Sequence, residues 1–177
     1  MDVQELPDWV FGYGSLMWNP GFEFEEQQQA RLIGLHRAPC IYSWKHRGTP
    51  ERPGIVLGLD RGGACVGSAF RLRRDDKLQV VAYLRERELV TNVYLETHRQ
   101  ITLANAQKVT ALVYVADRTH DQYAGKLTHN ELVTHIKGAV GNSGPNEPYI
   151  IDTAKQLQKM GIRDSLMENL ARELTGE

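Results

Sequence analysis

The hydrophobic and polar positions follow two different patterns along the chain. In the first two thirds, short apolar runs alternate with turn-forming residues, which is typical of β-strands. The expected strands cover residues 9–13, 30–35, 41–44, 55–59 and 66–72, and a further buried strand covers 109–116. We expect antiparallel pairing among the early strands. Residues 48–54 contain two prolines and two glycines, which predicts an irregular loop between two strands.

Helical spacing of apolar residues occurs once in this region. A helix is expected from Asp75 or Asp76 to about Arg87, because one face repeats at the intervals of a helix, through Leu78, Val81, Ala82 and Arg85. After it, residues 90–98 alternate loosely between apolar and polar, so strand structure is expected to resume there.

The last third of the chain is predicted to be helical. Thr128, with Glu131 three residues later, fits a capping box that opens a helix to about Val140. A second helix is expected from Tyr149 to about Gly161. A last helix is expected to begin at Asp164 or Ser165, with one face formed by Leu166, Leu170 and Leu174. Strands early and helices late favour an α+β fold, with a curled or barrel-like sheet and helices packed on one side.

Composition narrows the class of protein. The 177 residues are 41% hydrophobic and 24% charged, which predicts a single globular domain over residues 1–177. There are 21 basic and 22 acidic residues and no sustained basic stretch, so nucleic-acid binding is not expected. The longest apolar run, 111–116, is far shorter than the roughly 20 residues of a membrane span. The N-terminus does not resemble a secretory signal, and we expect a cytoplasmic protein.

The residues that usually bind metals are scattered. Cys40 and Cys65 are far apart and belong to no CxxC or Cys/His spacing, so they are expected to be small buried residues. None of the six histidines lies four residues from another or in an HExxH arrangement. The sequence therefore predicts neither a metal site nor a disulfide framework.

One glycine-containing turn has two interpretations. Phe11-Gly12-Tyr13-Gly14-Ser15-Leu16 follows a short apolar strand. Glycine permits positive φ and close approach of a ligand, so successive backbone N–H groups there can bind a carboxylate or an oxyanion. A tight turn without any ligand fits the same residues. A dinucleotide-binding fingerprint does not fit, because Met17 stands where its third glycine belongs.

A run of charges at the end of the first helix also has two interpretations. The run Arg85-Glu86-Arg87-Glu88-Leu89 fits solvated charges at a helix end. It also fits one carboxylate turned inward, and Glu88 is the candidate because apolar Leu89 and Val90 follow it. Desolvation at such a position raises the pKa of a carboxyl group and makes it a competent base.

Taken in order, four segments resemble the γ-glutamylcyclotransferase family of the ChaC type. The first is residues 9–18, WVFGYGSLMW, and the second is residues 46–54, HRGTPERPG. The third is Tyr83-Leu84 followed by Arg87-Glu88. The fourth combines Asn146-x-x-Tyr149 with the segment from Gly161 to Leu166. The resemblance extends over nearly the whole chain.

The resemblance implies a lyase with a small, mixed or antiparallel β-barrel and flanking helices, the γ-glutamylcyclotransferase-like fold. It implies cytosolic cleavage of γ-glutamyl peptides, glutathione in the ChaC branch, to 5-oxoproline and cysteinylglycine. By matching position, Glu88 is the expected catalytic acid/base and Tyr149 an expected substrate contact. The expected substrate-binding loop consists of Val10, Phe11, Gly12, Tyr13, Gly14, Ser15 and Leu16. Because the substrate's own α-amine can attack its γ-carbonyl, the reaction needs no cofactor.

Two other functions remain open at this point. The same catalytic element fits a cyclotransferase for other γ-glutamyl amines or γ-glutamyl amino acids. A non-catalytic γ-glutamyl-binding regulatory module is the second alternative, although an acid at position 88 argues against it. In each case the partner is a small molecule, and a monomer is the default expectation.

Overall fold

The computed structural model describes residues 6–176, and the chain divides into two compact units. The first unit consists of the residues up to Arg37 and of Leu59–Asp117. The second consists of Ala38–Gly58 and the residues from Arg118 onward. Two long strands, β2 (Glu26–Ser43) and β3 (Gly54–Arg71), contribute residues to both units. That residues 1–177 form one domain stays a prediction.

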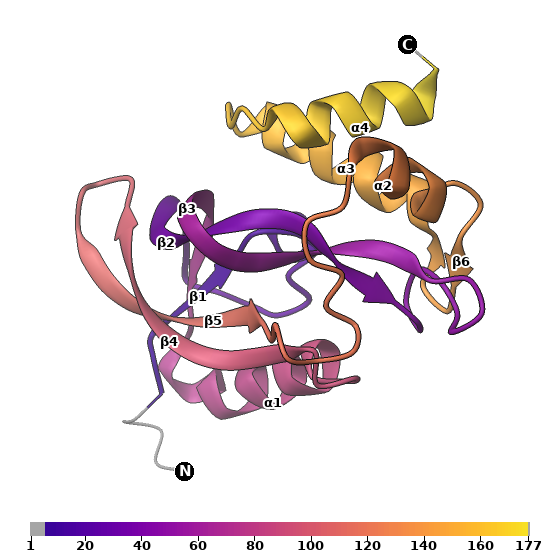
Figure 1. The fold of residues 1–177 in the computed structure, drawn as a ribbon. Coiled ribbons are helices and arrows are strands. Elements are labelled where there is room, and N and C mark those ends of the chain that lie inside the picture. Colours follow the sequence, from indigo (N-terminus) through magenta and orange to yellow (C-terminus); the bar gives the residue numbers. More distant parts are fainter. Residues whose placement is uncertain (1–5, 177) are drawn as a thin grey trace. The chain divides into compact units, whose positions relative to one another are not determined.

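Five strands form a closed barrel in the order β1-β3-β2-β4-β5 (Figure 1). Besides β2 and β3, it contains β1 (Trp9–Gly12), β4 (Tyr94–Leu103) and β5 (Lys108–Ala116). β1 pairs antiparallel with β3 and parallel with β5, whereas β4 and β5 form an antiparallel hairpin. The barrel is therefore mixed, and the predicted α+β fold with a small barrel is confirmed.

The long strands differ from the prediction. Each of β2 and β3 is continuous where the sequence pattern predicted two shorter strands. The interruptions in that pattern contain polar residues and glycines, and Gly62 and Gly63 adopt positive φ within β3. Both strands nevertheless run without a break through these residues, between hydrogen-bonded neighbours in the barrel. The interstrand ladder thus outweighs the local turn signal.

Helix α1 (Lys77–Glu88) covers part of the barrel within the first unit. Its Val80, Val81 and Leu84 pack in one hydrophobic cluster with residues of β1 and β5. The buried face has the predicted spacing but lies one residue earlier, because it starts at Lys77, and Leu78 is 48% exposed. Lys77 can occupy a buried position because its ammonium group reaches the carboxylate of Asp8.

The second unit contains three helices: α2 (His129–Ile136), α3 (Asn146–Lys159) and α4 (Ser165–Thr175). The predicted capping box of Thr128 and Glu131 is confirmed at the start of α2. The predicted start of α4 is also confirmed, since Asp164 caps this helix by accepting a hydrogen bond from the Met167 N–H at 3.2 Å. Its buried face contains Met167 and Leu170 rather than Leu166, which is 38% exposed.

Two helix boundaries of the second unit differ from the prediction. Helix α2 ends at Ile136 instead of near Val140, because a short hairpin of β6 (Val140–Gly141) and β7 (Gly144–Pro145) follows it. Helix α3 begins three residues before Tyr149, directly after that hairpin. Residues 48–53 form the irregular loop predicted over 48–54, whereas Gly54 is already the first residue of β3.

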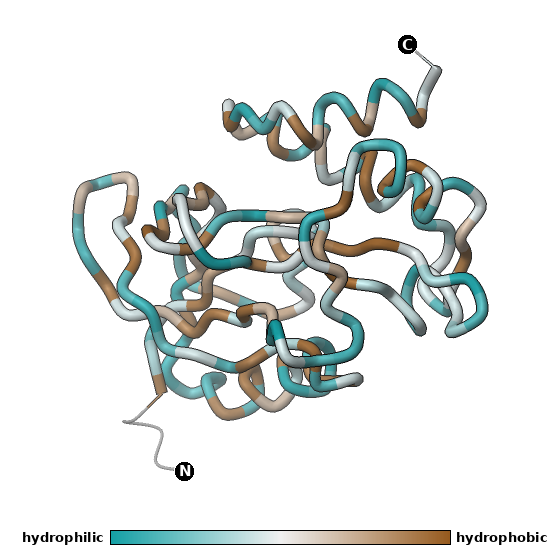
Figure 2. The backbone as a smooth tube through the Cα atoms, viewed as in Figure 1, coloured by the Kyte–Doolittle hydropathy of each residue, from teal (hydrophilic) through white to brown (hydrophobic). Residues whose placement is uncertain are grey.

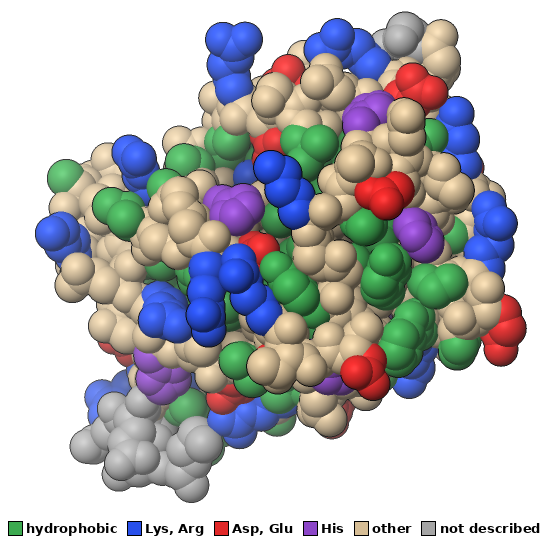
Figure 3. All heavy atoms as spheres, in the orientation of Figure 1, with side chains coloured by type: hydrophobic (Ala, Val, Ile, Leu, Met, Phe, Trp, Pro, Cys, Tyr) green, Lys and Arg blue, Asp and Glu red, His purple; other side chains and the backbone are tan. Residues whose placement is uncertain are grey.

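Hydrophobic and hydrophilic residues are interspersed along both the strands and the helices (Figure 2). The thiols of Cys40 and Cys65 are buried, at 1% and 2% exposure, as expected. Of the helices in residues 6–176, none is long and apolar enough to cross a membrane. On the face drawn in Figure 3, basic side chains are interspersed with acidic, histidine and hydrophobic ones.

Candidate active site

Glu88 is the last residue of α1, and its side chain is 17% exposed. It is thus largely withdrawn from water and still accessible. Burial raises the pKa of this carboxyl group, and the neighbouring Arg87 guanidinium partly opposes the rise. The C-terminal end of a helix also disfavours a negative charge. Of the two interpretations of the charged run, the inward-turned carboxylate agrees with the structure.

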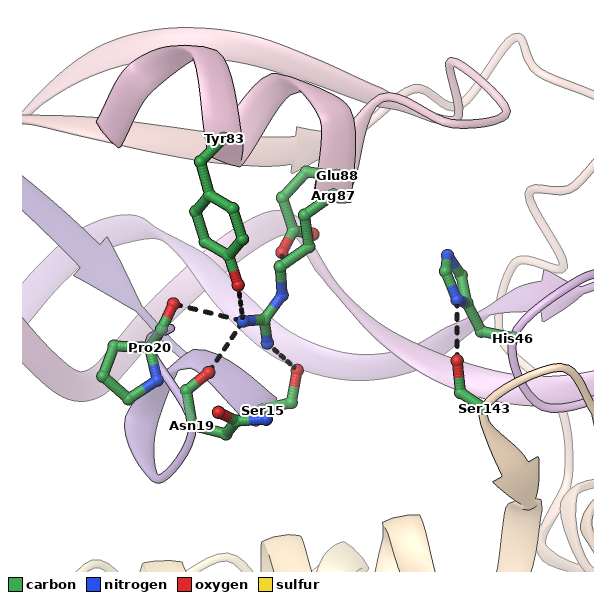
Figure 4. A network of polar contacts seen from close by, with 8 residues as sticks. All are labelled: Ser15, Asn19, Pro20, His46, Tyr83, Arg87, Glu88 and Ser143. Atoms are coloured by element: carbon green, nitrogen blue, oxygen red, sulfur yellow. Dashed lines mark hydrogen bonds and ion pairs between the residues drawn. The ribbon is translucent and has the colours of Figure 1, made fainter. Parts of the chain in front are cut away.

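Arg87 connects α1 to the segment that follows β1 (Figure 4). Its Nε lies 3.3 Å from Glu88 Oε1, and its Nη2 donates to Ser15 Oγ at 2.9 Å. Its Nη1 donates to the carbonyl oxygens of Asn19, at 2.7 Å, and Pro20, at 3.2 Å. Nη1 also donates to the Tyr83 hydroxyl at 3.1 Å. One guanidinium therefore contacts both the candidate base and the candidate loop.

The predicted loop, residues 10–16, begins in β1 and ends in a short 3-10 helix, η2 (Ser15–Met17). The side chains of Val10, Phe11 and Leu16 are buried. A ligand would therefore meet mainly the backbone of this segment and the Ser15 hydroxyl. Ser15 and Leu16 open the 3-10 helix, and the first N–H groups of a helix have no carbonyl partner within it.

Packing explains the glycine at position 12 of this loop. Neither Gly12 nor Gly14 has positive φ, so the left-handed conformation that glycine permits does not occur in this turn. Gly12 is required by close packing, since a Cβ added to it would lie 2.9 Å from Leu16 Cβ. In β3, a Cβ on Gly67 would collide with the carbonyl oxygen of Gly12. The two glycines allow β1 and β3 to approach each other closely.

A second arginine holds the same loop from β2. Arg37 Nε donates to the Tyr13 carbonyl at 2.6 Å, and Arg37 Nη2 donates to the Val66 carbonyl at 2.6 Å. The Tyr13 carbonyl is thereby directed toward Arg37. Because a trans peptide directs its carbonyl and its N–H to opposite sides, the Gly14 N–H points away from Arg37.

Close to Glu88, a polar network contains residues that the sequence analysis missed. Arg85 binds the Glu96 carboxylate with two hydrogen bonds of 2.9 and 2.7 Å, and the Tyr114 hydroxyl donates to Glu96 at 3.0 Å. The hydrogen bonds from Arg85 lower the pKa of Glu96. Burial, together with the charges of Glu96 and Glu88, raises the pKa of Tyr114, so this phenol stays protonated. No sequence signal links these residues, which come from α1, β4 and β5.

Tyr149 belongs to α3 in the second unit, where it and Asn146 bind the start of β3. The Tyr149 hydroxyl accepts a hydrogen bond from the Leu57 N–H at 3.2 Å. The amide of Asn146 pairs with the N–H and the carbonyl of Ile55 at 2.7 and 2.8 Å. The Asn146-x-x-Tyr149 element therefore has a structural role, and a contact between Tyr149 and substrate stays a prediction.

The loop that follows β2 is also fixed within the second unit. The Arg47 guanidinium lies over the ring of Tyr149, 5.4 Å from its centroid, and donates to the Ser143 carbonyl at 2.6 Å. His46 Nδ1 lies 3.0 Å from Ser143 Oγ (Figure 4). A Cβ on Gly48 would lie 2.6 Å from the Ser43 carbonyl oxygen, so glycine is required at this position. In residues 6–176, no three His, Cys, Asp or Glu side chains are grouped so that they could hold a metal ion.

The chain is similar to known proteins over most of its length. The chain is 37% identical to a glutathione-specific γ-glutamylcyclotransferase of Escherichia coli over 94% of its own length and 72% of that protein. It is 31% identical to the human glutathione-specific γ-glutamylcyclotransferase 1, over 90% of the chain and 73% of the human protein. The fold is similar to that of a yeast γ-glutamylcyclotransferase specific to glutathione, with a TM-score of 0.88, 20% identity and 97% of both chains covered. Residues 8–176 match the sequence profile of the ChaC-like proteins, and the chain belongs to this family.

Proposed function

We propose that this protein is a γ-glutamylcyclotransferase that degrades glutathione, with Glu88 as its general acid/base. The names of the relatives in Escherichia coli and human support the substrate. The observation that carries the proposal is the environment of Glu88, a largely buried carboxyl group with a raised pKa, which Arg87 links to Ser15 of the loop 10–16. The small-molecule substrate is glutathione, and the products are 5-oxoproline and cysteinylglycine.

The reaction is an intramolecular acyl transfer. The α-amine of the glutamyl group attacks its own γ-carbonyl, a C–N bond closes the five-membered ring, and the C–N bond to cysteine breaks. The α-ammonium loses two protons on the way to the lactam N–H, and the departing cysteinyl amine gains two. A carboxylate that accepts protons at one nitrogen and delivers them at the other serves both needs, which is the role we assign to Glu88. A raised pKa suits a group that must accept and release protons near neutral pH.

The loop of residues 10–16 is assigned the task of positioning. Its backbone N–H groups around Gly14 and Ser15 bind an anion of the substrate, either the α-carboxylate or the oxyanion that forms at the γ-carbonyl. Holding the flexible glutamyl arm in the attack geometry can lower the barrier by roughly 7–11 kcal/mol. We further assign Tyr149 as a substrate contact, on the basis of the family resemblance alone. The cytoplasm is the proposed site of action, and a monomer the proposed state.

The first test is direct turnover. Purified protein is incubated with glutathione, without added metal or nucleotide, and 5-oxoproline and cysteinylglycine are followed by mass spectrometry. The proposal expects both products in equal amounts from the wild type and none from Glu88→Gln, which keeps the size of the side chain and removes the base. A folded Glu88→Gln variant that retains wild-type turnover would refute the role of Glu88.

The substrate is tested separately. If glutathione gives no products, a panel of γ-glutamyl amino acids and γ-glutamyl amines decides between another cyclotransferase activity and none. Turnover of a panel member alone contradicts glutathione as the substrate and keeps the reaction type. Binding of a γ-glutamyl compound without turnover of any panel member favours a binding module instead.

A further inference from the structure

We infer that Arg87 is a positioning residue that couples the substrate loop, residues 10–16, to the catalytic base. Its guanidinium holds Ser15 of this loop and the segment that follows it up to Pro20, and it also faces the Glu88 carboxylate. The inference rests on the proposed function for the roles of Glu88 and the loop. It assigns to Arg87 two separable effects, one on substrate binding and one on the proton affinity of Glu88.

Each of the three nitrogens of the Arg87 guanidinium has a polar contact. Nη1 and Nη2 donate to Ser15, Asn19, Pro20 and Tyr83, whereas Nε faces Glu88. The side chain is 20% exposed, so the bonds are formed away from most of the solvent. Arginine has five N–H donors in a rigid planar arrangement, and lysine can supply a charge but not this set of directions. Binding of the loop therefore requires arginine, whereas the positive charge beside Glu88 could also come from lysine.

Among the charged groups around Glu88, Arg87 is the one that lowers the pKa of its carboxyl group. On α1, Arg87 is in ionic contact with Glu88 and opposes the rise of its pKa. From β5, Tyr114 faces the same region as a protonated, neutral phenol. From α1 and β4, Arg85 and Glu96 bind each other, so their charges compensate. The loop supplies Ser15, which does not titrate in this range. Removing the charge of Arg87 is thus expected to raise the pKa of Glu88 further.

Two substitutions separate the two effects. Arg87→Gln removes both the loop contacts and the charge. It is expected to raise the KM for glutathione about tenfold, since charge-assisted hydrogen bonds to the loop are lost. It should also move the acidic limb of the kcat/KM profile upward by about one pH unit or more, because an opposite charge beside the carboxylate is gone. Arg87→Lys keeps a charge near Glu88, so it should raise KM similarly and leave the acidic limb within about half a unit of the wild type.

The matched control is Arg73→Gln. Arg73 precedes α1 at its other end, is 51% exposed and pairs with Glu23 at 3.5 Å, so its loss should change neither KM nor the pH profile. A merely structural role of Arg87 would lower stability and leave the pH profile of the folded enzyme unchanged. If Arg87→Gln and the wild type have the same acidic limb, or if Arg87→Lys restores KM, the inference is wrong.

Two measurements that need no substrate turnover test the inference independently of the proposed activity. The carboxyl carbon of Glu88 is titrated by NMR in glutamate-labelled protein, with Glu88→Gln to assign its signal, and hydrogen exchange of residues 13–20 is followed by mass spectrometry. Arg87→Gln is expected to raise the titration midpoint and to speed exchange of this segment about tenfold or more. Unchanged values overturn the inference even if the enzyme degrades glutathione. Changed values uphold it even if glutathione proves not to be the substrate.

Discussion

Replacement of Asn146 by alanine tests how the second unit holds the start of β3. Asn146 is fully buried, and its amide is bonded to both backbone groups of Ile55, at 2.7 and 2.8 Å. Alanine would leave a buried N–H and a buried carbonyl without partners. Each such loss costs about 1–3 kcal/mol, so the sum is about 2–6 kcal/mol. Water that enters the vacated space can bind these backbone groups, so the loss should lie in the lower half of this range. We expect the free energy of unfolding to fall by about 3 kcal/mol.

Urea unfolding followed by circular dichroism measures this loss, with the slope m compared between variants. For a chain of this size, 3 kcal/mol corresponds to a fall in Tm of about 6–12 °C. Asn105→Ala is the matched control: its Oδ1 accepts from the Gln107 N–H at 3.0 Å in an exposed turn, and water can replace it. A loss below about 1 kcal/mol for Asn146→Ala, at unchanged m, would refute the reasoning that this amide satisfies buried backbone groups.

Two other predictions concern stability. Because the pKa of Glu88 is raised in the folded protein, the unfolded chain loses this proton at lower pH than the folded one, so the stability of the wild type should fall relative to Glu88→Gln as pH rises above about 4. Thermal melts of both proteins from pH 4 to 8 measure this change, and a stability difference that stays constant over this range would contradict the burial of this charge. Gly67→Ala should lose several kcal/mol, since its Cβ would meet the Gly12 carbonyl, whereas Gly34→Ala, with open space around it, should lose only about 1 kcal/mol from its positive φ. Similar losses for both glycines in urea unfolding would show that close packing is not the cause.

Local sequence signals predicted those elements whose determinants lie within a few residues. The capping box of Thr128 and the cap at Asp164 are of this kind, and both helices begin as predicted. The continuity of β2 and β3 could not be predicted in this way, because pairing with neighbouring strands carries them through polar and glycine residues. The buried face of α1 was misplaced by one residue, since an isolated sequence does not reveal that Asp8 provides a partner for a buried Lys77.

In the candidate site, too, only the features determined by nearby residues could be predicted from the sequence. The position of Glu88 could be proposed from the apolar residues that follow it and from the family resemblance. Its partners depend on contacts between distant segments: Arg87 with Ser15, Arg37 with Tyr13, and Glu96 with Tyr114. Charged runs at helix ends are usually solvated, so nothing local distinguishes Arg87 from Glu86. Only the folded chain shows which of these charges are turned inward.

The burial of the two cysteines has a practical consequence for an enzyme proposed to handle a thiol. Cys40 and Cys65 are almost wholly inaccessible, so the folded protein should neither form mixed disulfides with oxidised glutathione nor react with a maleimide. Any labelling of these thiols would therefore count molecules that have opened. The chain thus carries its own chemical reporter of unfolding, one that can be read in the purified protein without an added probe site.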